Sequence, residues 1–324
     1  MKLINKSWIE SNPKMKKQIA IAQRQPFGLI AAITLSPLIL PISAEASSFT
    51  RINVFGDSLV ETGNLFNLTG LPPSPPYFEG RFSNEEIWVD ILAETYDLNP
   101  ILATELGTII PTEGVNFAFS GATTGLTNIG GNALPGLQQQ IEAFRDLTAI
   151  APADVDALNI IWAGANDYFQ ALPSSDGAIV PLAEVPEQAT ENLASAVESL
   201  YEVGARNFLV VNLPDLGETP FTDSLNQFFP GIASQLNILT GIHNSLLDRQ
   251  LDNLSLLPEI ELTTLDANSL FRSIITEPSQ FGFSNINNSC LLNFQSGFMF
   301  DGVCENPNEF VFWDDIHPTS ATNQ

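Results

Sequence analysis

The chain has 324 residues, of which 44% are hydrophobic, and a formal net charge of −25 at pH 7. Six of its 12 basic residues lie in residues 1–46, whereas residues 47–324 contain six arginines, no lysine and 35 acidic residues. Phosphate binding depends on clustered cations, so this composition disfavours a nucleic-acid partner. The length is sufficient for a domain with a sizeable buried core.

Residues 1–46 are predicted to form a secretory signal peptide. A basic start is followed by an apolar run over residues 27–42 and then by Ala44-Glu45-Ala46, which fits an A-x-A cleavage site. The apolar run is shorter than the ~20 residues that span a bilayer and contains two prolines, which disfavours a membrane anchor. We therefore expect cleavage after Ala46, a secreted, periplasmic or cell-envelope location, and no transmembrane segment in the mature chain.

Strand and helix patterns alternate along residues 47–324, with no repeat or linker that divides them. This alternation predicts one domain of α/β class, a three-layer α/β/α sandwich around a central parallel sheet. The expected strands are 52–55, 115–119, 158–162, 208–212 and 260–265, and the expected helices are 85–96, 134–147, 187–203 and about 233–254.

The first expected strand runs into Gly56-Asp57-Ser58-Leu59, a tight turn that directs a serine out of the strand end. Open α/β sheets bind ligands at that edge, so Ser58 is the first candidate nucleophile. The competing interpretation is an Asx turn or a serine-capped helix start. A proline-rich stretch follows at residues 71–78, which we expect to form a loop near the mouth of the site.

Two later strand ends carry candidate oxyanion donors. Gly121 follows the second strand and can bring a backbone N–H close to a reacting carbonyl, although a plain turn glycine fits the same pattern. Asn166 follows the third strand, where its side-chain amide can donate to an oxyanion; an Asx turn is the alternative.

The chain has two histidines, His243 and His317. His243 lies in a helical pattern without a nearby preceding acid, and we interpret it as a helix-face residue. His317 follows Asp314 by three residues and precedes Pro318, which favours a fixed loop. Asp314 can accept a proton from the Nδ1 atom of His317 and hold the tautomer that a general base requires. An ordinary surface-loop histidine is the alternative.

Cys290 and Cys304 stand shortly before the His317 segment. In an oxidising compartment we expect them to form a disulfide, worth on the order of 3 kcal/mol through loop closure, rather than two free thiols. With two histidines, one of them assigned to catalysis, we expect no metal site and no cofactor.

Four blocks together resemble the GDSL or SGNH hydrolase family, and they occur in the family order. They are Gly56-Asp57-Ser58-Leu59, Ser120-Gly121-Ala122, Gly164-Ala165-Asn166-Asp167 and Asp314-Asp315-Ile316-His317. The longer segments, residues 210–217 and 312–314, look like the plant-type and bacterial lipase-like branch.

The resemblance implies a flavodoxin-like sheet, Ser58 as nucleophile, His317 as base and Asp314 as the residue that orients it. It also implies an oxyanion hole formed by the Ser58 N–H, Gly121 and Asn166. Asp315 does not match the pattern, and we expect it to be a solvated neighbour. Relatives usually continue past this block into a closing C-terminal helix, whereas only seven residues follow His317, so we expect that helix to be missing. Either the helix is dispensable here or the sequence is a truncated form.

The expected function is therefore a secreted serine ester hydrolase that cleaves carboxylic esters, of lipid type, through an acyl-serine intermediate. The sequence does not separate a lipase, phospholipase, short-chain esterase or carbohydrate O-deacetylase, and it does not set the oligomeric state. A non-catalytic lipid- or carbohydrate-binding module on the same fold is the alternative.

Overall fold

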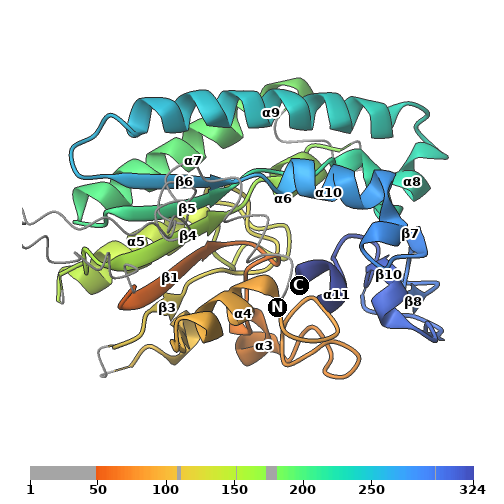
Figure 1. Ribbon diagram of the computed structural model, residues 1–324, viewed down its shortest axis with the longest axis horizontal. Coiled ribbons are helices and arrows are strands. Elements are labelled where there is room, and N and C mark those ends of the chain that lie inside the picture. The colour runs from red at the N-terminus through yellow and green to blue at the C-terminus, as the bar shows by residue number, and fades with distance from the viewer. Residues whose placement is uncertain (1–48, 108–110, 151, 173–180, 296) are drawn as a thin grey trace, which may run out of the picture. The chain divides into compact units, whose positions relative to one another are not determined.

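The computed structural model describes residues 49–107, 111–150, 152–172, 181–295 and 297–324, and residues 49–323 form one compact unit (Figure 1). The predicted signal peptide lies outside the described residues. Within the described ranges, no helix combines the length and the apolar character needed to cross a membrane.

The centre of the unit is a six-stranded sheet in which every neighbouring pair is parallel. Its strand order is β2-β3-β1-β4-β5-β6. The chain therefore moves to opposite sides of β1 when it enters β3 and β4, which makes the carboxyl ends of these strands the place where a ligand binds in such folds. The strands are β1 Arg51–Gly56, β2 Ile101–Leu102, β3 Val115–Asn116, β4 Ala157–Trp162, β5 Asn207–Val211 and β6 Glu261–Leu265.

Helices cover both faces of the sheet, as Figure 1 shows. Apolar residues of α5, α7 and α9 pack with Phe55, Ile161 and Val210 on one face. Residues of α4 and α10 pack with Val54 and Ile160 on the other. The helices are α3 Asn64–Thr69, α4 Trp88–Thr95, α5 Leu137–Thr148, α6 Ala165–Gln170, α7 Val185–Glu202, α8 Pro220–Asn226, α9 Ile232–Leu254, α10 Ala267–Thr276 and α11 Ser320–Asn323.

This arrangement confirms the predicted α/β class and the layered packing around a parallel sheet. Successive strand residues point to opposite faces, so β1 sends Val54 into one core and Phe55 into the other. Both faces of such strands are buried, which explains why the sequence shows continuous apolar runs rather than alternation.

The boundaries of β3 were predicted wrongly. The expected strand 115–119 ends at Asn116, because the N–H of Ala118 donates to the Asn116 side chain instead of continuing the ladder. The N–H groups of Phe117 and Phe119 still donate to Val54 and Gly56 of β1. The segment therefore stays beside β1 as far as the glycine turn that follows.

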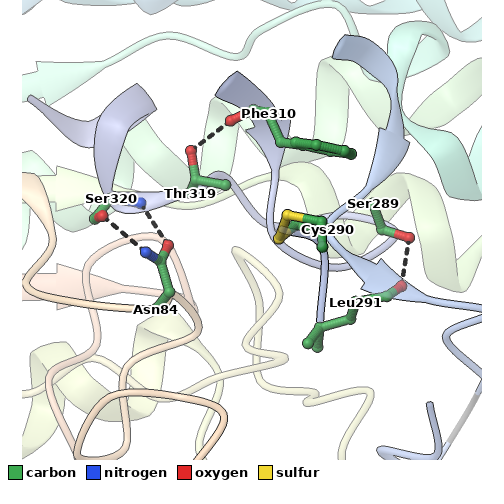
Figure 2. The surroundings of a disulfide bond; sticks show 8 residues. Asn84, Ser289, Cys290, Leu291, Phe310, Thr319 and Ser320 are labelled. Carbon is green, nitrogen blue, oxygen red and sulfur yellow. Dashed lines mark hydrogen bonds between the residues drawn. A yellow bond between two sulfur atoms is a disulfide. The ribbon is translucent and has the colours of Figure 1, made fainter. Parts of the chain in front are cut away.

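A smaller C-terminal region, which the sequence did not predict, packs beside the sheet. Strand β7 (Asn285–Ser289) pairs in parallel with β10 (Phe310–Phe312), and β8 (Leu291–Leu292) pairs antiparallel with β9 (Gly302–Val303). The disulfide between Cys290 and Cys304 closes the segment that contains β8 and β9 (Figure 2).

Candidate active site

The side chain of Gln140 binds both backbone groups of Gly56, the last residue of β1. The N–H of Gly56 donates to Oε1 of Gln140 at 2.8 Å, and Nε2 of Gln140 donates to the Gly56 carbonyl at 2.9 Å. A Cβ atom on Gly56 would lie 1.9 Å from the Trp162 carbonyl oxygen, and its φ is +146°, so only glycine fits here. This close approach of β1 and β4 sets the place of Ser58, which is 8% exposed.

Ser58, His317 and Asp314 lie in one hydrogen-bonded series, although Ser58 and His317 are 259 positions apart in the sequence. The Oγ atom of Ser58 is 2.8 Å from Nε2 of His317. The Nδ1 atom of His317 is 2.9 Å and 2.8 Å from the two carboxylate oxygens of Asp314. This is the geometry in which an imidazole can take a proton from a serine while a carboxylate fixes its tautomer.

Backbone contacts hold the His317 segment in place. The N–H of Trp313 donates to the His317 carbonyl at 2.8 Å. Just after the histidine, the N–H of Ser320 donates to Oδ1 of Asn84 at 2.9 Å, and Nδ2 of Asn84 donates to the Ser320 hydroxyl at 3.0 Å (Figure 2). The histidine is therefore fixed on both sides, with Ser320 already part of helix α11.

Gly121 has a left-handed backbone with φ of +78°, and a Cβ atom there would lie 2.6 Å from Oδ1 of Asn128. Among the described residues, no partner is found for the N–H of Gly121 or for the N–H of Ser58. Two buried backbone donors without partners are costly unless a ligand or solvent accepts from them. This pair has the properties expected of an oxyanion hole.

The side chain of Asn166 lies at the start of α6, after the carboxyl end of β4. Its Nδ2 atom donates to the Ala122 carbonyl at 3.0 Å and lies 3.5 Å from Oδ2 of Asp57. The structure thus connects Asn166 to the segment of Gly121 and to the residue before Ser58. To donate to an oxyanion, the Nδ2 group of Asn166 would give up its hydrogen bond to one of these two acceptors.

Three buried carboxyl groups surround these elements. Burial raises the pKa of Asp57 to about 7, and a weaker opposing effect comes from the Leu59 N–H bound to Oδ1 at 3.0 Å. Burial raises the pKa of Glu61 to about 8; its side chain accepts hydrogen bonds from the N–H groups of Leu65 and Ser120. These groups fix the backbone on either side of Ser58 and before Gly121.

The third buried carboxyl group is Asp167, whose pKa burial raises to about 6. It accepts hydrogen bonds from the N–H and the hydroxyl of Thr124 at 2.9 Å and 2.6 Å. This contact connects the Asn166 helix to the segment after Gly121.

Two residues next to the series were not predicted from the sequence. The hydroxyl of Tyr77 donates to Oδ2 of Asp314 at 2.7 Å, and the ring of Phe82 lies 4.7 Å from the imidazole of His317. Tyr77 belongs to the proline-rich stretch that we expected near the mouth of the site. That composition was the available signal, but it did not indicate which side chain would make the contact.

His243 and Asp315, which we did not expect to take part in the chemistry, are both more buried than a solvent-exposed side chain would be. His243 is a helix residue, as expected, and it is fully buried on the inner face of α9. Asp315 is not a simple solvated neighbour, because its Oδ1 accepts from the Ser289 hydroxyl at 3.2 Å and burial raises its pKa. Among the described residues, no group of three or more His, Cys, Asp or Glu residues is placed to hold a metal ion.

A serine, a histidine and an aspartate thus lie in series at the carboxyl ends of a parallel sheet, where the strand order reverses, which is an arrangement typical of hydrolases. Comparison with known families gives a match over most of the chain. The sequence model of GDSL-like Lipase/Acylhydrolase matches residues 52–324, and the chain belongs to that family. It is accordingly a carboxylic ester hydrolase.

The chain is also similar in sequence to individual proteins with esterase, lipase or acyltransferase names. The chain is 26% identical to a phosphatidylcholine-sterol acyltransferase of Aeromonas hydrophila over 81% of this chain and 71% of that protein. It is 27% identical to GDSL esterase/lipase 6 of Arabidopsis thaliana over 90% and 88%. A solved acetyl xylan esterase, AlAXEase, is 12% identical with a TM-score of 0.40 and covers 84% of this chain and 93% of its own, too distant to bear on substrate.

Proposed function

We propose that the protein is an exported serine esterase that acts on lipid-type carboxylic esters through an acyl-serine intermediate. The observation that carries the proposal is the 2.8 Å contact between Oγ of Ser58 and Nε2 of His317, with Asp314 on the other ring nitrogen. The basic, apolar and A-x-A pattern of residues 1–46 supports export.

The reaction proceeds in two steps. The Ser58 oxygen attacks the ester carbonyl while its proton passes to His317, and the N–H groups of Ser58 and Gly121, with Asn166, stabilise the oxyanion. The C–O bond to the alcohol then breaks, and His317 gives its proton to the leaving oxygen. Water attacks the acyl-serine by the same route, which releases the acid and restores the Ser58 hydroxyl.

A lipid-type substrate is supported by the apolar surroundings of the histidine. Phe82 contacts the His317 ring, and Phe298 packs 6.2 Å from Phe82 between ring centroids. The segment 290–304, which holds Phe298, contains one charged residue, Asp301, in a strongly acidic chain. An acyl chain fits these surroundings better than a polar sugar does.

The test is labelling with a fluorophosphonate probe, together with hydrolysis of p-nitrophenyl esters from acetate to palmitate. We expect covalent label on Ser58, located by peptide mapping, and loss of both label and turnover in Ser58→Ala. Ser273→Ala is the matched control, because that exposed serine on α10 donates only to the Ser269 carbonyl within its own helix.

The same experiment separates the alternatives. Faster turnover of long-chain esters supports the lipid assignment, whereas activity confined to acetate favours a carbohydrate O-deacetylase. Folded protein that neither takes up label nor hydrolyses any ester would favour a non-catalytic binding module and would contradict the proposal.

A second candidate reaction is transfer of the acyl group to an alcohol instead of water. It is favoured by the similarity to the phosphatidylcholine-sterol acyltransferase over 81% of the chain. Adding a long-chain alcohol or a sterol to the assay and measuring the new ester by mass spectrometry distinguishes transfer from hydrolysis.

A further inference from the structure

Tyr77 is the contact of Asp314 that lies farthest from it in sequence. Its phenol oxygen donates to Oδ2 of Asp314 at 2.7 Å, and the tyrosine is only 2% exposed. The other contacts to the carboxylate come from Ile316 N–H, at 2.9 Å, and from the N–H and Nδ1 of His317.

Aromatic neighbours fix the direction of the Tyr77 ring. Phe82, Phe298 and Trp313 surround it with ring centroids 5.9, 5.6 and 6.3 Å away, all in edge-to-face arrangements. Such packing limits rotation of the ring and keeps the hydroxyl directed at Asp314. The contact is therefore a preorganised part of the site and is not shared with solvent.

The chemistry of the pair makes Tyr77 the donor. Burial, and then the charge of Asp314, raises the pKa of Tyr77 above its ordinary value, so the phenol keeps its proton. Burial alone would raise the pKa of Asp314, but His317 and the hydrogen bonds from His317 and Tyr77 lower it below its ordinary value. The carboxylate is thus charged. Its Oδ2 atom accepts from the tyrosine, and the Nδ1 atom of His317 lies 2.8 Å from Oδ2 and 2.9 Å from Oδ1.

We propose that Tyr77 is a positioning residue for the hydrolysis, which orients the Asp314 carboxylate and limits how strongly it binds the histidine proton. This inference rests on the proposed function, since it assigns Tyr77 a role through Asp314 and His317. A charge-assisted hydrogen bond is directional, so the tyrosine fixes Oδ2 and with it the orientation of the carboxylate toward the imidazole. By sharing the negative charge, it also makes that oxygen less basic.

The ionisable groups that act on the Asp314–His317 pair come from separate elements. They are Tyr77 from the proline-rich loop, Asp57 from the turn after β1, and Asp315 from the same segment as Asp314. Asp57 and Asp315 are unchanged when Tyr77 is replaced, so a shift of the pH profile in that variant reports the lost phenol.

The test is Tyr77→Phe, which removes the hydroxyl and keeps the ring. We expect kcat to fall about tenfold with KM changed less than about twofold, because one charge-assisted hydrogen bond to the carboxylate is lost. Without the phenol the carboxylate is more basic and favours the imidazolium, so the acid limb of kcat/KM should move to higher pH.

Tyr168→Phe is the matched control. Tyr168 is also fully buried, and its hydroxyl has no hydrogen-bond partner among the described residues. Its replacement should leave kcat, KM and the pH profile unchanged. An equal fall in both variants would show a general packing effect and would overturn the proposal.

A double-mutant cycle separates positioning from structural support. In an Asp314→Asn background, Tyr77→Phe should change the rate of fluorophosphonate labelling by less than about twofold, because the charged acceptor is already gone. The same tenfold factor in both backgrounds would contradict a role through Asp314.

If Tyr77→Phe does not fold, site-specific incorporation of 3-fluorotyrosine at position 77 keeps the hydroxyl and makes it a stronger donor. The acid limb should then move to lower pH, and an unchanged profile would overturn the proposal. The wild-type protein is labelled in parallel: absence of label on Ser58 counts against the proposed esterase itself, whereas label on Ser58 with a normal Tyr77→Phe variant counts against the positioning role alone.

Discussion

The two histidines, His317 and His243, are both largely buried, but only His317 has the hydrogen-bond partners that an imidazole needs for proton transfer. His317 has a side chain 13% exposed and is held between Ser58 and Asp314. His243 is completely buried in α9 beside Tyr168, and neither of its ring nitrogens has a hydrogen-bond partner among the described residues.

The difference lies in the partners. Burial without a partner lowers the pKa of His243 to about 3, so that ring stays neutral and is a packing group. His317 has an acceptor on one nitrogen and a hydroxyl on the other, which is the arrangement needed to move a proton. Substitutions of His317 and His243 test this contrast, and a substitution of Asn166 tests the proposed oxyanion hole.

The largest effect is expected for His317→Gln. Loss of the proposed base should reduce kcat by about 10⁴-fold or more, as when a histidine of a serine triad is removed. The check is p-nitrophenyl ester hydrolysis, with circular dichroism to verify folding. A folded His317→Gln variant that keeps more than a tenth of the wild-type rate would rule out this histidine as the base.

A smaller loss is expected for Asn166→Ala. Removal of this proposed oxyanion donor should lower kcat by about 10²–10³-fold with little change in KM, because such a donor acts on charge that develops during the reaction. Steady-state kinetics measures both constants. A rise in KM at constant kcat would instead assign Asn166 to substrate binding, and Gln170→Ala, an α6 variant farther along the same helix, is the control.

The smallest effect on activity is expected for His243→Leu, with kcat within about twofold of wild type because the residue contacts no reacting group. Its effect should appear in stability. The pKa of His243 is about 3 in the folded protein, below its value in the unfolded chain. Below about pH 6.5 the unfolded wild-type chain therefore binds one more proton than the folded protein, and the free energy of unfolding decreases as the pH is lowered.

Leucine removes this effect. The difference in unfolding free energy between His243→Leu and wild type should therefore shift by about 2 kcal/mol in favour of the variant between pH 7 and pH 5. Urea unfolding at the two pH values measures it, and contributions from the carboxyl groups cancel in the difference. A pH-independent difference would mean that the histidine is charged or has a partner in the folded protein.

Much of the fold followed from local patterns. The apolar runs at 52–55, 158–162 and 208–212 predicted β1, β4 and β5 to within one residue at each end. Helix α7 was predicted to within two residues, with Pro186 in its first turn. Short elements were missed, because a two-residue strand such as β2, or helix α3 of six residues, leaves no periodic signal.

Corrections arose where side chains compete with backbone pairing. Asn116 ends β3 by accepting the N–H of Ala118, and Asp315 finds a partner in Ser289 across the C-terminal region. The first contact joins residues only two apart, but the apolar run at 115–119 gave no sign of it. The second joins residues 26 apart and depends on how the C-terminal region folds.

The sequence by itself determined the α/β class, the family and the residue types proposed for the chemistry, because strand-end serine, glycine and asparagine motifs and the Asp-x-x-His spacing are local. Only the tertiary structure placed Tyr77 on Asp314, clamped Gly56 with Gln140 and left His243 without a partner. Those contacts join segments 84 to 237 residues apart, or depend on every neighbour of a buried ring. Such distances and directions are set by the packing of the whole fold, and a local sequence pattern contains no information about them.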